Sequence, residues 1–301
     1  MARAAQPATW SPERGQAIAA YAFITPAMVI IVVFTLAPVI CALYLSFTNY
    51  DVFTRLDWIG AQNYQDIADD ELFWRALWNT IQYVVYSIPL SMGSGLGLAL
   101  LLNRNISGLG LYRTVYYVPV VTSMVAVAMI WIQLFDPLYG VISTAVQALG
   151  LTGVDWLGDP NLAMPSVIAV SVWKVVGWNM LIYLAGLQGI PKHVYEAAAI
   201  DGANHWQTLT RITVPLLQPT TFFIFVTSLI GAFQVFDVVY VMTGGGPANA
   251  TTTLVQHIYN SAFKAFDMGY AAALSFVLFG IIMLVTLVSF RAMRGGDVSY
   301  S

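Results

Sequence analysis

Long apolar stretches without charged residues dominate the chain and predict membrane-spanning helices. A helix needs about 20 apolar residues to cross the hydrocarbon core of a bilayer. Four windows hold no charge at all, 15–50, 76–103, 114–135 and 268–290, while two equally apolar stretches hold one charge each, Lys174 and Asp237. We therefore predict an all-α, polytopic membrane protein with a six-helix transmembrane domain over 17–290. Its spans are expected at about 18–47, 77–102, 113–134, 163–187, 219–243 and 268–290.

Composition supports the membrane as the solvent of this chain. Of its 301 residues, 58% are hydrophobic and 9% are charged, and the mean hydropathy is +0.72. Water-soluble domains carry far more charge than this. The net charge of −3 and the lack of any run of Lys and Arg argue against a nucleic-acid partner.

The distribution of Lys and Arg predicts the orientation, because positively charged loops stay in the cytoplasm. Six spans place both termini and the second and fourth loops on one side, which holds eight of these residues, against three on the other side. Both tails, 1–16 and 291–301, are therefore predicted to be cytoplasmic. The eight are Arg3, Arg14, Arg104, Arg113, Lys192, Arg211, Arg291 and Arg294, and the three are Arg55, Arg75 and Lys264.

Residues typical of enzyme or metal sites are scattered along the chain. No Gly-Lys pair occurs, so a phosphate-binding P-loop is excluded. His193, His205 and His257 stand apart, which predicts no metal site. The single cysteine, Cys41, falls inside the first span and is expected to pack in the core. We expect no catalytic residues in this chain.

The segment 191–219 is the longest internal polar stretch and is predicted to form two short helices. Pro191 suits a first helical turn, and the residues from Lys192 to Ile200 favour a helix. Gly202 can adopt the left-handed backbone that ends a helix, and Asn204 can cap a second one running toward Val214. A compact, projecting unit of this kind suggests docking to another protein.

The same segment resembles the EAA loop of binding-protein-dependent importer permeases. The matching residues are Glu196, Ala197, Ala198, Gly202, Ile212 and Pro215 at the family spacing, with Val214 where the family usually has Leu. The likeness continues through Gly60, Asn63, Tyr64, Asn79, Thr80 and the run 243–247, and so covers roughly 15–290.

This resemblance implies the fold and partners of a type I ABC importer permease in a bacterial cytoplasmic membrane. In that family the loop, here 191–215, inserts into a separate ATPase subunit, and two permeases face each other over two ATPases and receive a sugar-like solute from an external binding protein. ATP and Mg are then bound by the ATPases, and this chain binds no cofactor. The coupling residues implied here are Glu196, Ala197, Ala198, Asp201, Gly202, Ala203, Ile212 and Pro215. The alternative is that Glu196 and Asp201 are ordinary solvated charges.

Polar residues inside the spans are the candidates for the solute path, because such residues are costly in a bilayer. Lys174 and Asp237 come first, with a structural ion pair or a snorkelling Lys174 as the alternative. Trp173, Asn179 and Gln234 could supply aromatic faces and hydrogen bonds to a sugar, or could simply pack. Resemblance to the maltose-type permease adds Ser171, Trp178, Ser228, Gly231, Ala232 and Val235.

Three other functions stay open at this point. A permease of the same family could carry a glycerol phosphate, a glycerophosphodiester or a polyol. An ion-coupled secondary transporter should show inverted repeats, and we find none. A membrane-bound enzyme should show convergent catalytic groups, and we find none in the loops. The external loops 51–71 and 136–159 are where we expect a binding protein to land.

Overall fold

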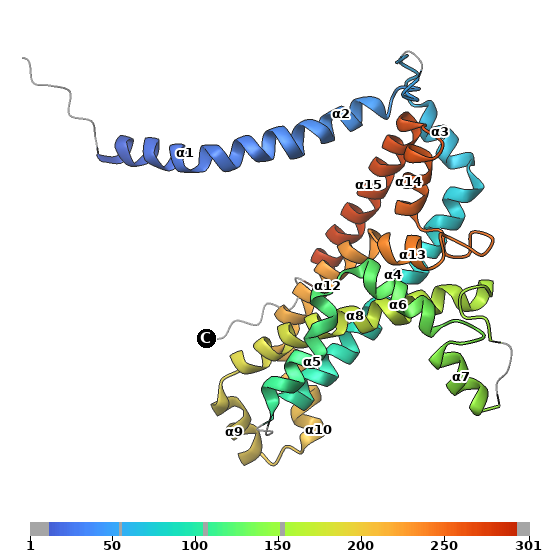
Figure 1. Ribbon diagram of the computed structural model, residues 1–301. Helices are drawn as coiled ribbons and strands as arrows, with labels where there is room; N and C mark the ends of the chain where they lie inside the picture. The colour runs from blue at the N-terminus through green and yellow to red at the C-terminus, as the bar shows by residue number, and fades with distance from the viewer. Residues whose placement is uncertain (1–11, 54–55, 105–107, 151–153, 294–301) are drawn as a thin grey trace, which may run out of the picture.

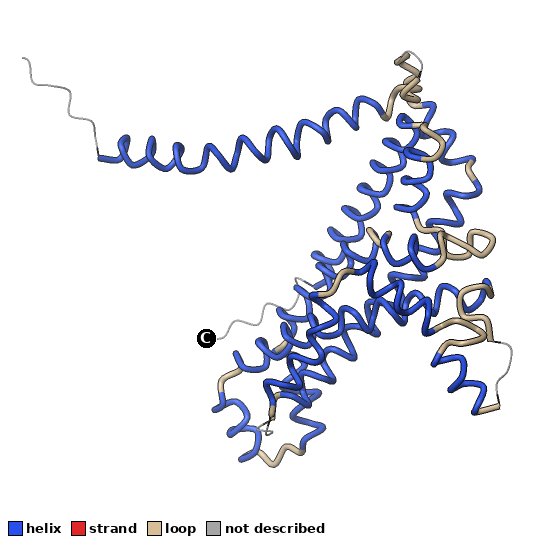
Figure 2. The backbone as a smooth tube through the Cα atoms, viewed as in Figure 1, coloured by secondary structure: helices blue, strands red, loops and turns tan. Residues whose placement is uncertain are grey.

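The protein is a bundle of helices that differ greatly in length. The computed structural model describes residues 12–53, 56–104, 108–150 and 154–293, so most of both predicted tails lies outside the described residues. Figure 2 shows helix through most of the described chain. The helices are α1 (Pro12–Ile31), the π-helical turn η1 (Val32–Leu36), α2 (Ala37–Leu45), α3 (Gln62–Asp69), α4 (Glu71–Leu102), α5 (Leu109–Val121), α6 (Met124–Leu134), α7 (Val141–Ala148), α8 (Pro160–Gly189), α9 (Lys192–Ile200), α10 (His205–Thr208), the π-helical turn η2 (Leu209–Thr213), α11 (Val214–Leu216), α12 (Gln218–Phe233), α13 (Asp237–Met242), α14 (Leu254–Phe263) and α15 (Met268–Met293).

Four of these rods are long and apolar enough to cross a membrane unbroken. They are Gly15–Leu45, Glu71–Leu102, Pro160–Gly189 and Met268–Arg291. Two pairs of helices, each bent at a short break, raise the number of candidate spans to six. Helix α5 is bent by 99° relative to α6, and His205–Leu216 is bent by 63° relative to α12. The all-α membrane fold predicted from the sequence is thereby confirmed.

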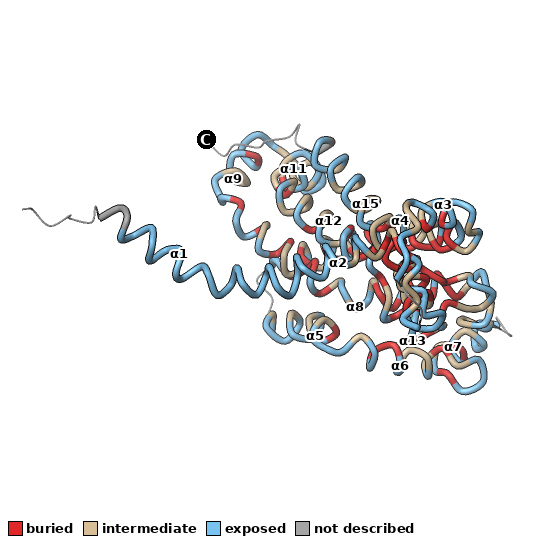
Figure 3. The backbone as a smooth tube through the Cα atoms, turned by 90° about the horizontal axis from the view of Figure 1, so that it is seen from above, coloured by how far each residue is buried: buried red, intermediate tan, exposed pale blue. Residues whose placement is uncertain are grey.

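The first rod, formed by α1, η1 and α2, extends away from the rest of the chain (Figures 1 and 3). None of the residues in its most apolar stretch is buried by the protein. Cys41 lies on this rod and is exposed, so the prediction that it packs in the core was wrong. The reason is that no other helix of this chain covers the rod at that position.

Helices α4 and α8 form the centre of the bundle and approach each other closely. At Gly95 on α4, an added Cβ atom would lie 2.6 Å from the Cβ of Asn179 on α8. At Gly177 on α8, an added Cβ would overlap the carbonyl oxygen of Tyr116 on α5. Small residues at such crossings let helix backbones pack tightly in membranes. Both contacts fix α8 between its neighbours.

Two of the predicted spans are interrupted. The span predicted at 113–134 is divided at Thr122 and Ser123, three residues after Pro119, into α5 and α6. The span predicted at 219–243 is divided at 234–236 into α12 and α13. The half-helices after the breaks, α6 and α13, pack against each other. Proline removes a backbone donor and so favours the first interruption.

A hydrogen-bonded cluster ties together the end of the bundle opposite α9. Asp70, which caps α4 by accepting from the Leu72 amide at 2.8 Å, also accepts from Tyr270 Oη at 2.7 Å and pairs with His257 Nε2 at 2.9 Å. Burial raises the pKa of the Asp70 carboxyl, but these hydrogen bonds and the charge of His257 outweigh it and leave the pKa below its usual value. The cluster joins α4, α14 and α15 through one carboxylate.

We expect Asp70→Ala to lower the stability of the folded chain by about 2 kcal/mol, because it removes a helix cap and the acceptor for the buried His257 and the half-buried Tyr270. The measurement is the thermal midpoint of the purified protein in detergent. Asp69→Ala, at the neighbouring exposed carboxylate, is the matched control and should leave the midpoint unchanged. Equal midpoints for the two variants would contradict the assignment.

The same cluster predicts a loss of stability at acid pH. Burial lowers the pKa of His257, although the charge and hydrogen bond of Asp70 oppose this shift. A histidine with a depressed folded-state pKa contributes its stability above its ordinary pKa of about 6.5 and loses it as the pH falls through the folded-state value. His257→Gln keeps a donor for Asp70 but does not titrate. Unfolding midpoints measured from pH 7.5 to 5 should therefore fall less in this variant than in the natural protein.

Candidate functional site

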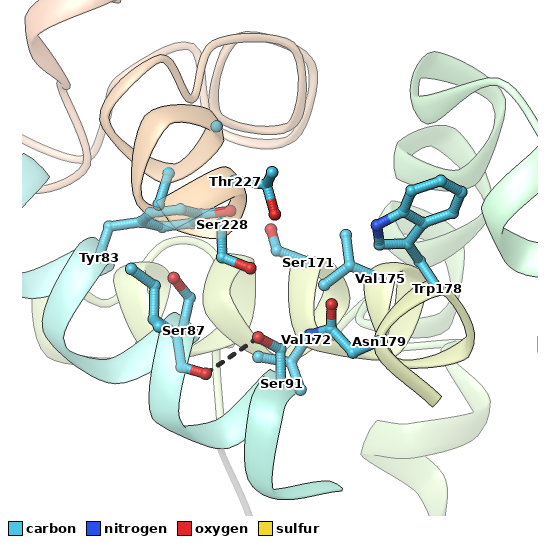
Figure 4. Close-up of a pocket in the computed structure, with 13 residues that line it drawn as sticks. Tyr83, Ser87, Ser91, Ser171, Val172, Val175, Trp178, Asn179, Thr227 and Ser228 are labelled. Atoms are coloured by element: carbon cyan, nitrogen blue, oxygen red, sulfur yellow. Dashed lines mark hydrogen bonds between the residues drawn. The ribbon is translucent and has the colours of Figure 1, made fainter. Parts of the chain in front are cut away.

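A cavity of about 280 Å³ lies between α4, α8 and α12, lined mainly by hydroxyl, amide and aromatic side chains (Figure 4). Six of the eleven residues predicted for the solute path line it: Ser171, Trp178, Asn179, Ser228, Gly231 and Ala232. The structure therefore brings together residues from two helices that are separated by about fifty positions in the sequence.

A second cavity, of about 230 Å³, adjoins the first and lies at the breaks in the third and fifth spans. It shares Tyr83, Ser171, Val175 and Gly231 with the first cavity. Its other lining includes four more residues predicted for the solute path: Lys174, Gln234, Val235 and Asp237. Met124, the first residue of α6, also lines it. The two cavities form one polar region in the centre of the bundle.

Trp173 is the exception among the residues predicted for the solute path. It lines a different, apolar hollow together with Tyr86 and Pro165, and its ring meets that of Trp131 edge-on at 5.4 Å. Two residues along a helix turn the side-chain direction by about 200°, so Trp173 points away from the side of α8 that carries Ser171. The structure gives Trp173 a packing position.

Sequence reasoning missed the contribution of α4. Tyr83, Ser87 and Ser91 line the first cavity, opposite Ser171 and Asn179 (Figure 4). Their spacing of four residues places all three on one face of a helix. That regular polar spacing in an apolar span was the signal available in the sequence, where Ser91 was only one of several small residues.

Asn179 carries a buried amide donor in the wall of the first cavity. The residue is 2% exposed, and its Nδ2 atom has no hydrogen-bond partner among the described residues. A buried amide donor without a partner costs free energy, which a hydrogen bond to a ligand or to water recovers. Trp178, one residue earlier, is 46% exposed and stands at the rim of the same cavity.

Lys174 and Asp237 do not form the ion pair considered from the sequence. The Nζ atom of Lys174 donates to the carbonyl oxygens of Pro119 at 3.0 Å, Val120 at 3.3 Å and Thr122 at 2.9 Å. Asp237 is exposed at the start of α13. The three donors of the ammonium group are thus used within the protein, while the carboxylate faces the second cavity.

The coupling-loop segment forms the two helices predicted for it. Helix α9 covers Lys192–Ile200, Gly202 has a φ of +77°, and the amide of Ala203 donates to the carbonyl of Ala198 at 2.9 Å. This is the hydrogen bond that closes a helix ending in left-handed glycine. Asn204 and Gln207 then cap each other reciprocally at 2.9 Å at the start of α10. Both turns are therefore fixed by local hydrogen bonds.

The predicted coupling residues divide into anchoring and exposed positions. Ala198 is buried, and Ala203 and Ile212 are half-buried, so these three hold the loop together. Glu196, Ala197, Asp201, Gly202 and Pro215 are exposed. Sequence reasoning missed two large apolar side chains at the tip, Ile200 and Trp206, which are 87% and 71% exposed.

The coupling loop is joined rigidly to the bundle. Tyr195 on α9 packs against the buried cluster made by the ends of α4, α8 and α12, and its hydroxyl accepts from Thr213 Oγ1 at 3.4 Å. Figure 1 shows α9 and α10 projecting together at one end of the molecule. The segment 191–215 is thus attached to the end of α8 by side-chain packing.

Three known proteins that this chain resembles in sequence are all named as transport permeases. The chain is 39% identical over 279 residues to the probable ABC transporter permease protein YesP of Bacillus subtilis, covering 91% of this chain and 90% of the relative. It is 35% identical to the sulfoquinovosyl glycerol transport system permease protein SmoG of Agrobacterium fabrum, covering 94% and 92%. It is 37% identical to the lactose transport system permease protein LacF of Rhizobium radiobacter, covering 90% and 93%.

A solved structure has the same fold. The chain matches a crystal structure of a bacterial ABC transporter involved in the import of the acidic polysaccharide alginate, with a TM-score of 0.82 and 25% identity, over 95% of this chain and 98% of that one. This match confirms the predicted permease fold. The relatives argue against a secondary transporter and against a membrane-bound enzyme.

The family model described as binding-protein-dependent transport system inner membrane component matches residues 78–294, which include the cavity-lining helices and the coupling loop. The chain belongs to this family, the membrane-spanning permeases of ABC transporters.

Proposed function

We propose that this chain forms half of the path by which an ATP-driven importer carries a neutral, sugar-like solute across a bacterial cytoplasmic membrane. The observation that carries this proposal is the cavity between α4, α8 and α12, with its hydroxyl and amide groups and the unpartnered Asn179 amide. Such groups suit a polyhydroxy solute, and Trp178 at the rim offers a ring face for stacking. The names of SmoG and LacF, which refer to a sulfo-sugar glycoside and to a neutral sugar, support a sugar-like solute, and that of LacF supports a neutral one.

The charges near the cavity favour a neutral solute over a glycerol phosphate or phosphodiester. The thirteen residues lining the first cavity include no charged side chain. In the second cavity, the ammonium group of Lys174 donates hydrogen bonds to backbone carbonyls, and Asp237 contributes a carboxylate. An anionic solute would meet repulsion there without a free cation from the described lining residues.

The exposed tip of the coupling loop supports docking to a separate ATPase subunit. Glu196 offers a charge-assisted hydrogen bond, and Ile200 and Trp206 offer apolar anchors of the kind that dominate protein interfaces. In this proposal two ATPase subunits bind ATP and Mg, while this chain binds no cofactor and is not catalytic.

The uncovered first rod supports a second permease subunit. The most apolar window of Gly15–Leu45 is not buried by its own chain. The first cavity is open on the side where the exposed Trp178 lies. A second, homologous permease would cover the rod and close the path. An external binding protein would deliver the solute at the loops 51–71 and 136–159, which contain the short helices α3 and α7.

One end of the bundle carries the coupling loop and four of the eight Lys and Arg residues that were predicted to be internal. The ends of α4 and α8 pack around Tyr195, and Phe290 near the end of α15 meets Phe222 at the start of α12 with ring centroids 4.8 Å apart. Arg104, Lys192, Arg211 and Arg291 therefore gather at this end, which supports a cytoplasmic location for the loop and the C-terminus.

Glu196→Arg should uncouple transport from ATP hydrolysis, because it reverses the charge of the proposed ionic anchor. We expect ATP-driven uptake in proteoliposomes to fall by about tenfold, which corresponds to the free energy of one charge-assisted hydrogen bond. Glu196→Asp, which keeps the negative charge at the same exposed position, is the control for ATPase copurification and hydrolysis and should retain most of the uptake. Unchanged uptake in Glu196→Arg, with the complex intact, would count against the docking assignment.

Asn179→Leu should weaken solute recognition, because it replaces the unpartnered amide with an apolar group of similar shape. Loss of one hydrogen bond worth about 1 kcal/mol raises the KM of uptake about fivefold. The same substitution at Asn161, an exposed residue at the start of α8, should leave KM unchanged. If both variants transport like the natural protein, Asn179 does not contact the solute.

A further inference from the structure

Lys174 holds the last turn of a neighbouring helix. Its three hydrogen bonds all go to the C-terminal end of α5, where the chain bends by 99° into α6. The last carbonyls of a helix have no partner within that helix. The ammonium group supplies the missing donors, and its positive charge lies at the negative end of the helix dipole.

The contact between α8 and α5 has a second level one turn away. The missing side chain at Gly177 lets the backbone of α8 lie against the carbonyl of Tyr116. The Thr122 hydroxyl also donates to the carbonyl of Pro119 at 2.7 Å, so a local hydrogen bond stabilises the bend as well. Helix α5 is thus fixed to α8 at two successive turns, one through backbone packing and one through Lys174.

This joint lies beside the two cavities, on the helix that leads to the coupling loop. Helix α8 runs directly into α9 through Ile190 and Pro191, and α6 begins just beyond the bend with Met124 in the wall of the second cavity. Any movement of α8 relative to the bend must either carry the bend along or break three hydrogen bonds to a charged group.

We propose that Lys174 is a positioning residue that fastens the bend between α5 and α6 to α8, so that movement of the coupling loop carries the cavity wall with it. This inference rests on the proposed function, but it assigns Lys174 a role other than solute binding. A snorkelling lysine would send its Nζ atom to water, and a solute ligand would keep a donor free. The observed geometry satisfies all three donors with backbone carbonyls.

The test uses the complete importer complex with a single label beside the bend. Cys41 is the only cysteine, so Cys41→Ser gives a background in which Ser123→Cys carries one nitroxide spin label. Ser123 is exposed, and its side chain makes no capping hydrogen bond at α6. The variants are Lys174→Met, which keeps length without charge, and Lys174→Arg, which keeps the charge and its donors. Lys264→Met, at a lysine over the Tyr240 ring at 5.7 Å, is the matched control.

In Lys174→Met we expect a more mobile label at 123 and about a tenfold lower ratio of solute transported to ATP hydrolysed, with KM changed less than twofold. Lys174→Arg should restore at least half of that ratio and the immobile label spectrum, and Lys264→Met should match the background. If Lys174→Met is not recovered in folded form, Lys174→Gln replaces it, since a shorter side chain with two N–H donors should give an intermediate label mobility.

Two results would overturn the proposal. A KM raised tenfold or more at unchanged label mobility would make Lys174 a solute ligand. Label mobility and coupling ratio both equal to the background would leave Lys174 without a positioning role. If the Cys41→Ser, Ser123→Cys background complex itself shows no ATP-driven uptake of any neutral sugar, the proposed function fails, while label mobility still decides whether Lys174 fastens the bend.

Discussion

A backbone amide or carbonyl inside the hydrocarbon layer must find its partner within the protein, and this constraint governs both broken helices beside the cavity. At the first break, the carbonyls of Pro119 and Thr122 are held by the side chain of Lys174. At the second, the carbonyl of Val235 accepts from the buried hydroxyl of Thr253 at 3.0 Å. Each interruption is thus supported by a side chain from another helix or loop. Irregular backbone can therefore form part of the cavity wall.

The sequence predicts the coupling loop well because its structure depends on neighbours in the chain. Gly202 ends α9, and Asn204 with Gln207 begins α10, through hydrogen bonds that span no more than five residues. The apolar spans are predicted for a similar reason, since length and hydropathy are local properties. The resemblance carried by Glu196 to Pro215 then supplied six of the eleven candidate path residues, five of them on α8 and α12. Those residues do gather around two adjoining cavities.

The rest depends on contacts between distant segments, which a single sequence does not show. Lys174 and the carbonyls that it holds are more than fifty residues apart, so the sequence alone could suggest only a solute contact, an ion pair or a snorkelling side chain. The pairing of Asp70 with His257 joins residues 187 positions apart. Cys41 was misplaced, and Trp173 lies apart from the other candidates, because the direction of a side chain around an apolar helix leaves little trace in a sequence that is apolar on every side. The four-residue spacing of Tyr83, Ser87 and Ser91 on α4 was visible in the sequence. Only the packing of α8 against α4 shows that these side chains line a cavity.

Along α8, the position that sets the helix crossing with α5 and the positions that give the cavity its chemistry are separate residues. Gly177 fixes the distance to α5, while Ser171 and Trp178 face the cavity. A substitution at a cavity-facing hydroxyl leaves that glycine contact as it is, whereas a larger side chain at Gly177 would push two helices apart. Single substitutions can therefore change which hydrogen-bonding groups the cavity presents, without altering the crossing of the two helices.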